Sequence, residues 1–463
     1  MLLPVTESRR VLRVTALVIA GLVSSASGLA QTAAQGVFPD AAGSWGNFGV
    51  GGVAATNGAF FQSLGSNGRS CGSCHVPSDA WTATPAKLLA RFQATKGTDP
   101  VFASIDGSNC PTLDVSTLAA RQTASSLLLK KGLIRIPLSP PATADYTVSA
   151  LSNPYGCTSK TSVSVYRRIP PSANLQFLST VMWDGRETRA AASLVANLSQ
   201  QASDAVTGHA QAVAVPSALA VQSIVGAELA QFMAQVSSST AGSLIPPAAQ
   251  GGPVVLAQQD FFAGINDPFG ARNTGNGVPP LPVFTLYTPW ETLVPRTAAQ
   301  TAQASIGRGQ RLFNTLPIAI TRVKGLNDLT DANGVPRTTI IGTCGTCHNT
   351  PNVGSHSMPL LVDLGIGASN RATPDMPLIT LTNKKTGAFL QVTDPGLALV
   401  SGKFADIGKF KVPGLRGLAA RAPYFHDGSA ASLTDVVRFY NGRFNLNLTA
   451  QQEADLTGFL QSL

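Results

Sequence analysis

The sequence predicts a mainly α-helical fold with two domains, long irregular loops and little β-structure. Two copies of a Cys-x-x-Cys-His motif, at residues 71–75 and 344–348, place one cofactor-binding segment in each half of the chain. Helical patterns in the last third and a long Ser/Gly/Pro/Gln-rich stretch at residues 237–282 support helices joined by irregular loops. A chain of 463 residues normally holds two or three domains.

The repeated motif is typical of covalent c-type haem attachment. Its two thiols add to the two vinyl groups of a haem, and the adjacent imidazole binds the iron. A thioredoxin-like pair does not require the histidine, and a zinc site needs a further ligand pair nearby. We therefore expect two covalently bound c-type haems. The attachment residues are Cys71, Cys74 and His75 in the first motif and Cys344, Cys347 and His348 in the second.

The amino terminus has the pattern of a secretory signal peptide at residues 1–30. Three arginines precede a short apolar run at residues 14–23, and Gly28-Leu29-Ala30 offers a small-residue cleavage site. The apolar run is too short for a comfortable membrane span, and no second candidate span follows it. We expect an exported protein of the bacterial periplasm, with no stable membrane span after the signal is removed.

The basic composition does not indicate nucleic-acid binding. Removing residues 1–30 lowers the formal net charge from +9 to +7, and four haem propionates would offset about half of it. Charged residues make up only 12% of the chain, and no basic run is interleaved with aromatic residues. We expect an ordinary solvated surface.

Two cysteines, Cys110 and Cys157, lie outside the haem motifs. Because oxidation is the default in an exported protein, we expect them to form a disulfide. Two free buried thiols are the alternative.

In the first half, the composition predicts few regular elements. Residues 31–57 are expected to be irregular, residues 58–64 a short helix and residues 78–89 a helix. Residues 98–114 are expected to be a loop. A helix should end at Gly132, and a short strand over 133–138 should follow it; residues 210–236 suggest an amphipathic or buried helix.

We place the domain boundary between residues 31–295 and residues 296–463. The stretch at 237–282 is expected to be an elaborated loop of the first domain, because a connection this long usually has a role. In the second domain, Ile306 and Phe313 suit a first helix that packs against the closing helix. The closing helix begins with a capping box at Thr449–Gln452, followed by an apolar stripe at Leu456, Phe459, Leu460 and Leu463.

Three further segments resemble the bacterial di-haem cytochrome c peroxidase and MauG family. They are Lys-Val-Pro-Gly-Leu-Arg at 411–416, Ala-Pro-Tyr-Phe-His-Asp-Gly at 422–428 and Trp-Asp-Gly-Arg-Glu at 183–187. With both haem motifs in the expected order, the resemblance covers about residues 58–232 and 300–463. It implies two cytochrome c-type haem domains and a tryptophan, Trp183, between the haems.

In the peroxidase branch a methionine is the second ligand of the second haem, at a position that is Tyr440 here. A tyrosine resembles the MauG branch, and a phenolate favours ferric iron, so the resemblance implies a low potential for this haem. An ordinary core tyrosine is the alternative. His356 and Met358 are rival ligands.

The first haem of the peroxidases has a distal histidine before the Trp segment, but no histidine lies between His75 and Trp183. We therefore expect a five-coordinate first haem that is open to H2O2. A Gln and a Glu follow the Trp segment in the family; Gln201 and His209 fall near these positions. We expect His209 to be the distal base, since breaking the O–O bond needs an acid–base group. Direct ligation of iron and a surface position are the alternatives.

These residues predict a periplasmic peroxidase that reduces H2O2 at the first haem. The second oxidising equivalent would pass through Trp183 to the second haem, and a periplasmic electron-donor protein or protein substrate would supply the electrons. An electron-transfer cytochrome and a rubber-oxygenase-like enzyme are the alternatives. The family also implies a calcium ion between the domains, near Asn174 and the backbone of residues 421–423.

Overall fold

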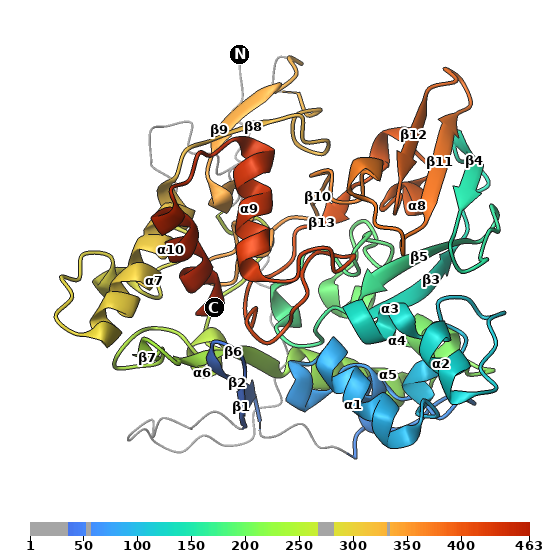
Figure 1. Ribbon diagram of the computed structural model, residues 1–463, viewed down its shortest axis with the longest axis horizontal. Coiled ribbons are helices and arrows are strands. Elements are labelled where there is room, and N and C mark those ends of the chain that lie inside the picture. The colour runs from blue at the N-terminus through green and yellow to red at the C-terminus, as the bar shows by residue number, and fades with distance from the viewer. Residues whose placement is uncertain (1–35, 52–56, 267–281, 331–333) are drawn as a thin grey trace, which may run out of the picture. The chain divides into compact units, whose positions relative to one another are not determined.

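The computed structural model describes residues 36–51, 57–266, 282–330 and 334–463 (Figure 1). These residues belong to one unit, which spans residues 34–463. The expected signal peptide at 1–30 lies outside the described residues, as do residues 267–281 of the expected loop at 237–282. No helix of the described ranges is long and apolar enough to cross a membrane.

The helices of the first half begin and end where side chains satisfy their terminal backbone groups. Ser193 caps α4 by accepting a hydrogen bond from the backbone N–H of Ala196, and Ser217 caps α5 in the same way. Gly132 ends α3 with a positive φ of 63°, which a glycine adopts without strain. The α-helices are α1 (Pro85–Thr95), α2 (Leu118–Ala124), α3 (Ser126–Lys131), α4 (Leu194–Gly208), α5 (Ala218–Leu229) and α6 (Pro253–Leu256).

The second half is organised by α7 (Ala298–Thr315) and α10 (Ala450–Gln461), which pack against each other. A Cβ at Gly309 of α7 would lie 2.0 Å from the carbonyl oxygen of Asp455, so the close approach of the two helices requires glycine there. Thr449 and Gln452 form the expected capping box of α10. The other helices here are α8 (Ala398–Ser401) and α9 (Leu433–Phe444).

The strands form five antiparallel sheets of two to four strands. Two of them join segments that lie far apart in the sequence, β2 with β6 and β4 with β11. In sheet order the strands are β1 (Val37–Pro39), β2 (Gly43–Gly49), β6 (Gln231–Ser238) and β7 (Gly242–Ser243); β12 (Phe389–Val392), β11 (Leu378–Asn383) and β4 (Tyr146–Ser152); β3 (Leu133–Leu138) and β5 (Val163–Arg168); β8 (Ile318–Thr321) and β9 (Thr339–Gly342); β10 (Leu361–Val362) and β13 (Phe410–Lys411).

Short 3-10 helices supply the remaining regular structure, and two of them carry the first cysteines of the haem motifs. They are η1 (Ala59–Phe61), η2 (Cys71–Ser73), η3 (Pro77–Asp79), η4 (Pro100–Phe102), η5 (Leu175–Phe177), η6 (Thr288–Trp290), η7 (Cys344–Thr346), η8 (Ser369–Arg371) and η9 (Phe404–Asp406).

The prediction of a mainly α fold with little β-structure is wrong. The described residues contain thirteen strands beside ten α-helices. Residues 43–49 were expected to be irregular, and residues 231–236 were expected to be helical, yet they pair with each other in one sheet. Pairing between distant segments stabilises short strands whose own residue pattern does not indicate them.

Local expectations were more accurate. The helix that ends at Gly132 and the strand over 133–138 are confirmed, and so are α7 and α10. The helix expected at 78–89 instead begins at Pro85, where proline is favoured in the first turn. The disulfide between Cys110 and Cys157 is confirmed, with Cα atoms 5.7 Å apart.

Candidate functional site

The second Cys-x-x-Cys-His motif opens on a cavity of about 220 Å³. Cys344 and Cys347 line it with His348, and their thiols are free. The capping box of Thr343 and Thr346 holds the motif in a single 3-10 turn. The rest of the wall is mostly apolar and comes from α7, α9, α10 and the residues around β13. Size and lining suit a flat, largely apolar cofactor.

The tautomer and protonation state of His348 are those that a metal-binding histidine needs. Its Nδ1 lies in hydrogen-bond contact with the carbonyl of Gly354, which can only accept, so Nδ1 carries the proton and Nε2 keeps its lone pair. Burial lowers the pKa of His348 to about 4, so the ring is neutral at physiological pH. A neutral imidazole is the form that ligates iron.

The first motif repeats this arrangement. Nδ1 of His75 lies 3.1 Å from the carbonyl oxygen of Trp81, and burial lowers the pKa of His75 to about 4. Ala80 and Trp81 adopt positive φ values of 54° and 55°. Such backbone strain in non-glycine residues clusters at functional sites, and here it positions the carbonyl that orients His75.

The four motif cysteines are half-buried neutral thiols. Burial raises the pKa of Cys74 to about 11 and that of Cys71, Cys344 and Cys347 to about 12. A catalytic Cys-x-x-Cys pair needs a lowered thiol pKa. Free, unionised thiols paired with an oriented histidine fit haem attachment better than thiol–disulfide exchange.

Tyr440 of α9 lines the same cavity as His348. Burial raises the pKa of its phenol, and the two thiols Cys347 and Cys344 add to this shift. The rival residues His356 and Met358 are not among the described residues that line it. Nδ1 of His356 is instead 3.0 Å from the carbonyl oxygen of Met358.

His209 ends α4 and is linked to the first motif. Its Nδ1 lies 2.5 Å from a carboxylate oxygen of Asp106, and Asp106 also pairs with the buried Arg69, two residues before Cys71. The His209 side chain keeps 39% of its surface exposed, so small solutes can reach it. Sequence reasoning missed Asp106, because nothing in a lone carboxylate more than a hundred residues away indicates this pairing.

Gln201 lies on the same helix but eight residues earlier. This separation corresponds to about 12 Å along the helix axis, so α4 does not bring its side chain to His209.

Trp183 lies at the wall of the cavity, between parts of both halves of the chain. Its indole N–H donates to the carbonyl of Arg168 at 2.8 Å, and the ring of His426 meets it edge-on with centroids 6.3 Å apart. The ammonium of Lys411 lies 5.9 Å from the Trp183 ring centroid. The same wall includes Thr82, next to the Trp81 carbonyl that orients His75.

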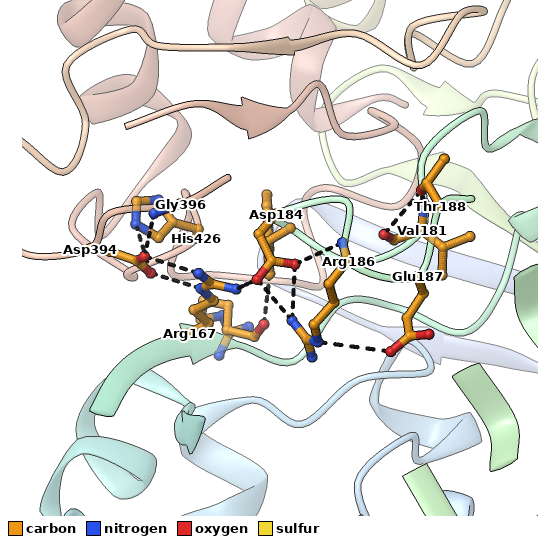
Figure 2. A network of polar contacts seen from close by, with 11 residues as sticks. Arg167, Val181, Asp184, Arg186, Glu187, Thr188, Asp394, Gly396 and His426 are labelled. Atoms are coloured by element: carbon orange, nitrogen blue, oxygen red, sulfur yellow. Dashed lines mark hydrogen bonds and ion pairs between the residues drawn. The ribbon is translucent and has the colours of Figure 1, made fainter. Parts of the chain in front are cut away.

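A buried ionic network fixes this region (Figure 2). Arg167 of β5 contacts Asp184, next to Trp183, and also Asp394, with Nε 2.7 Å from the Asp394 carboxylate. His426 lies beside Asp394, at 3.8 Å. Burial alone would raise the pKa of Asp184, but Arg167 and Arg186 overcome this effect and lower it to about 2. Arg167 thus ties the Trp segment to the second half of the chain.

Two buried cations near the cavity have no carboxylate partner within the described ranges. Lys411 lines the cavity, and burial lowers its pKa to about 8; the Nε of the neighbouring Arg416 has no hydrogen-bond acceptor. A buried cation is costly unless an anion accompanies it. The propionates of a haem would supply such anions, so the residues present fit this cofactor.

Two of the oxygens expected to bind calcium are bonded within the chain itself. Both ends of the Asn174 amide bond to the backbone of Met233, and the carbonyl of Arg421 accepts from the Arg168 guanidinium. No group of three or more His, Cys, Asp or Glu side chains in the described ranges could hold a metal.

Part of the amino-acid sequence is similar to those of known cytochrome c peroxidases. Cytochrome-c peroxidase IdrP1 of Denitromonas iodatirespirans is 30% identical over 140 residues, which cover 26% of this chain and 36% of that protein. Cytochrome c551 peroxidase of Nitrosomonas europaea is 32% identical over 126 residues, covering 26% and 30%. By sequence, this part of the chain is similar to cytochrome c peroxidases. The resemblance seen in its motifs is therefore confirmed, although the match spans only about a third of these relatives.

Other comparisons add little. No family model matches the chain. A solved MauG-like protein associated with microbial copper homeostasis shares 16% identity, over 88% of this chain and 85% of that one, with a TM-score of 0.38. This likeness is too low to carry an argument about the site.

Replacing Arg167 with Met should strongly destabilise the folded chain. The change leaves Asp394 buried without its cation and Asp184 with only Arg186, and breaking a buried ion pair typically costs about 3–5 kcal/mol. Chemical denaturation measures the loss. The control is Arg438→Met, because Arg438 is 64% exposed and its pair with Glu453 should contribute less than about 1 kcal/mol. Equal stability of the two variants would contradict the role of Arg167.

Stability should also fall in acid. The pKa of Asp184 drops from its ordinary 3.8 to about 2 in the folded chain, and the pKa of Asp394 is lowered as well. Their contribution is therefore present above about pH 4 and is lost as the pH falls towards 2. Urea unfolding measured from pH 6 to pH 2 should show this loss, and Arg167→Met should show a smaller decline over the same interval. Parallel curves would contradict the assignment.

Proposed function

We propose that this chain is a periplasmic di-haem c-type peroxidase that reduces H2O2. One haem would be held by Cys71, Cys74 and His75, and the other by Cys344, Cys347 and His348. The observation that carries the proposal is the apolar cavity behind the second motif, whose wall contains both Tyr440 and Trp183. Haem supplies the redox chemistry when bound; the chain supplies ligands, proton transfer and a path for electrons.

The two histidines would act as iron ligands through Nε2. In each, the Nδ1 proton is directed to a backbone carbonyl, of Trp81 for His75 and of Gly354 for His348. This hydrogen bond sets the tautomer and increases the basicity of the ligating nitrogen. Tyr440 would be the second protein ligand at the second motif. An anionic phenolate there favours ferric iron and a low potential.

His209 would be the acid–base group at the first motif. The Asp106 carboxylate accepts the Nδ1 proton of His209, which leaves Nε2 to take a proton from one peroxide oxygen and return it to the other. Buried Arg69 holds Asp106 in place, as the orienting third member of such a chain does.

Trp183 would carry the second oxidising equivalent between the two haem sites. Its position on the cavity wall, with the Arg168 carbonyl and the His426 ring against it, supports this role. The electrons would come from a periplasmic electron-donor protein, or from side chains of a protein substrate oxidised in place. The Cys110–Cys157 disulfide supports an oxidising compartment such as the periplasm.

Peroxide titration of the purified holoprotein tests this function. We expect high-spin ferric absorption from the first haem and complete reaction with a stoichiometric amount of H2O2, followed by visible and near-infrared spectroscopy. Two six-coordinate irons that are inert to peroxide would contradict the proposal and leave an electron-transfer cytochrome. Cleavage of polyisoprene with O2 and no response to peroxide would indicate a rubber-oxygenase-like enzyme.

Replacing Trp183 with Phe should slow charge sharing between the haems. Phenylalanine keeps an apolar ring but is harder to oxidise and lacks the N–H bonded to Arg168. We expect the near-infrared signal of charge sharing to form at least about tenfold more slowly, equivalent to ~1.4 kcal/mol in the barrier. Trp290→Phe is the matched control, because Trp290 stacks on Tyr287 and does not line the cavity. An unchanged rate in Trp183→Phe would reject the relay.

A further inference from the structure

Two of the oxygens expected to bind calcium, the Asn174 side-chain oxygen and the Arg421 carbonyl, are engaged by the chain itself. The side-chain oxygen of Asn174 accepts from the backbone N–H of Met233 at 2.9 Å, and the Asn174 amide donates to the carbonyl of Met233, also at 2.9 Å. Asn174 therefore serves as a clamp on β6, because both ends of its amide are bonded to the same strand residue.

The guanidinium of Arg168 joins three separate segments of the chain through their backbone carbonyls. One nitrogen, Nη2, donates to the carbonyl of Arg421 at 3.2 Å. The other, Nη1, donates to the carbonyls of Ala83 and Lys131, at 3.2 and 3.1 Å. A cation ligated by carbonyl oxygens from three separate segments performs the task that a structural metal ion performs with its ligands.

Arg421 adds a second cation beside the first. Its Nε donates to the carbonyl of Gly417 at 3.1 Å, and its Nη2 donates to the carbonyls of Gly414 and Arg416, at 3.2 and 2.9 Å. These carbonyls belong to the loop that follows β13 and carries part of the cavity wall. The Arg421 side chain thus bonds to the carbonyls of that loop, and the Arg168 side chain bonds to the carbonyl of Arg421.

The charge here disfavours a divalent ion. Burial, and then the neighbouring Arg421, lower the pKa of Arg168 to about 10; burial lowers that of Arg421 to about 10 as well. Both groups stay charged at neutral pH, and neither forms an ion pair with a carboxylate in the described ranges. Calcium prefers six to eight oxygens that include carboxylates, whereas here it would meet two cations.

We propose that the guanidinium groups of Arg168 and Arg421 take the structural place of a calcium ion, so that this chain keeps its Trp183 region ordered without calcium. The backbone of Arg168 reinforces the link, since its N–H donates to the His426 carbonyl at 2.6 Å and its carbonyl accepts from the Trp183 indole. Cation, tryptophan and histidine are therefore anchored to one residue of β5. The inference does not depend on peroxidase activity.

Metal analysis and melting of the purified holoprotein test the proposal directly. We expect well under one calcium per chain by mass spectrometry, and the same melting temperature in EDTA and in millimolar CaCl2. A ligand that binds only the folded chain raises its stability, so a real site would show a rise in calcium. Stoichiometric calcium, or a melting temperature that falls in EDTA and recovers with calcium, would overturn the proposal.

Two variants test the structural role of the second guanidinium. Arg421→Met should lower the melting temperature by several degrees and change the fluorescence of the buried tryptophans, because three carbonyls lose their donor. Arg311→Met, on the exposed face of α7, is the matched control and should change neither. If Arg421→Met has the same melting temperature and tryptophan fluorescence as Arg311→Met, the Arg421 guanidinium has no structural role and the proposal fails. If Arg421→Met does not fold, the calcium measurements on the unmodified protein decide.

Discussion

The contact on which the rest of the site depends is the buried arginine between two buried aspartates. Arg167 lies on β5, Asp184 follows Trp183, and Asp394 comes from the second half and borders His426. None of the three charges can remain buried alone at an acceptable cost, so each holds the other two in place. These ion pairs also fix the candidate site, because the segments that they join surround the indole of Trp183.

The two Cys-x-x-Cys-His motifs have similar local structures, although different loops orient their histidines. Each haem motif forms a 3-10 turn with a capping box, and each histidine directs Nδ1 to a carbonyl. In the first motif that carbonyl belongs to Trp81, whose backbone is strained, and in the second it belongs to Gly354. Burial keeps both imidazoles neutral. In both cases Nδ1 is bonded to a carbonyl and Nε2 keeps its lone pair, an arrangement that different loops can provide.

Positive charge is the second organising element. Lys411 and Arg416 lack carboxylate partners in the described part of the chain and suit the propionates of a haem, whereas Arg168 and Arg421 are engaged by backbone carbonyls. Lys411 and Arg416 are therefore suited to bind an anion, whereas Arg168 and Arg421 hold loops together.

The sequence by itself determined the features that lie in contiguous motifs: the two Cys-x-x-Cys-His segments, the capped closing helix and the segment of Trp183. These features depend on residues within a few positions of one another, which a one-dimensional pattern retains. Only the tertiary structure decided the pairing of β2 with β6, the Asp106 partner of His209 and the engagement of the Arg421 carbonyl by Arg168. Each of these joins residues far apart in the chain, and short strands or single charges have no local signal that identifies a distant partner.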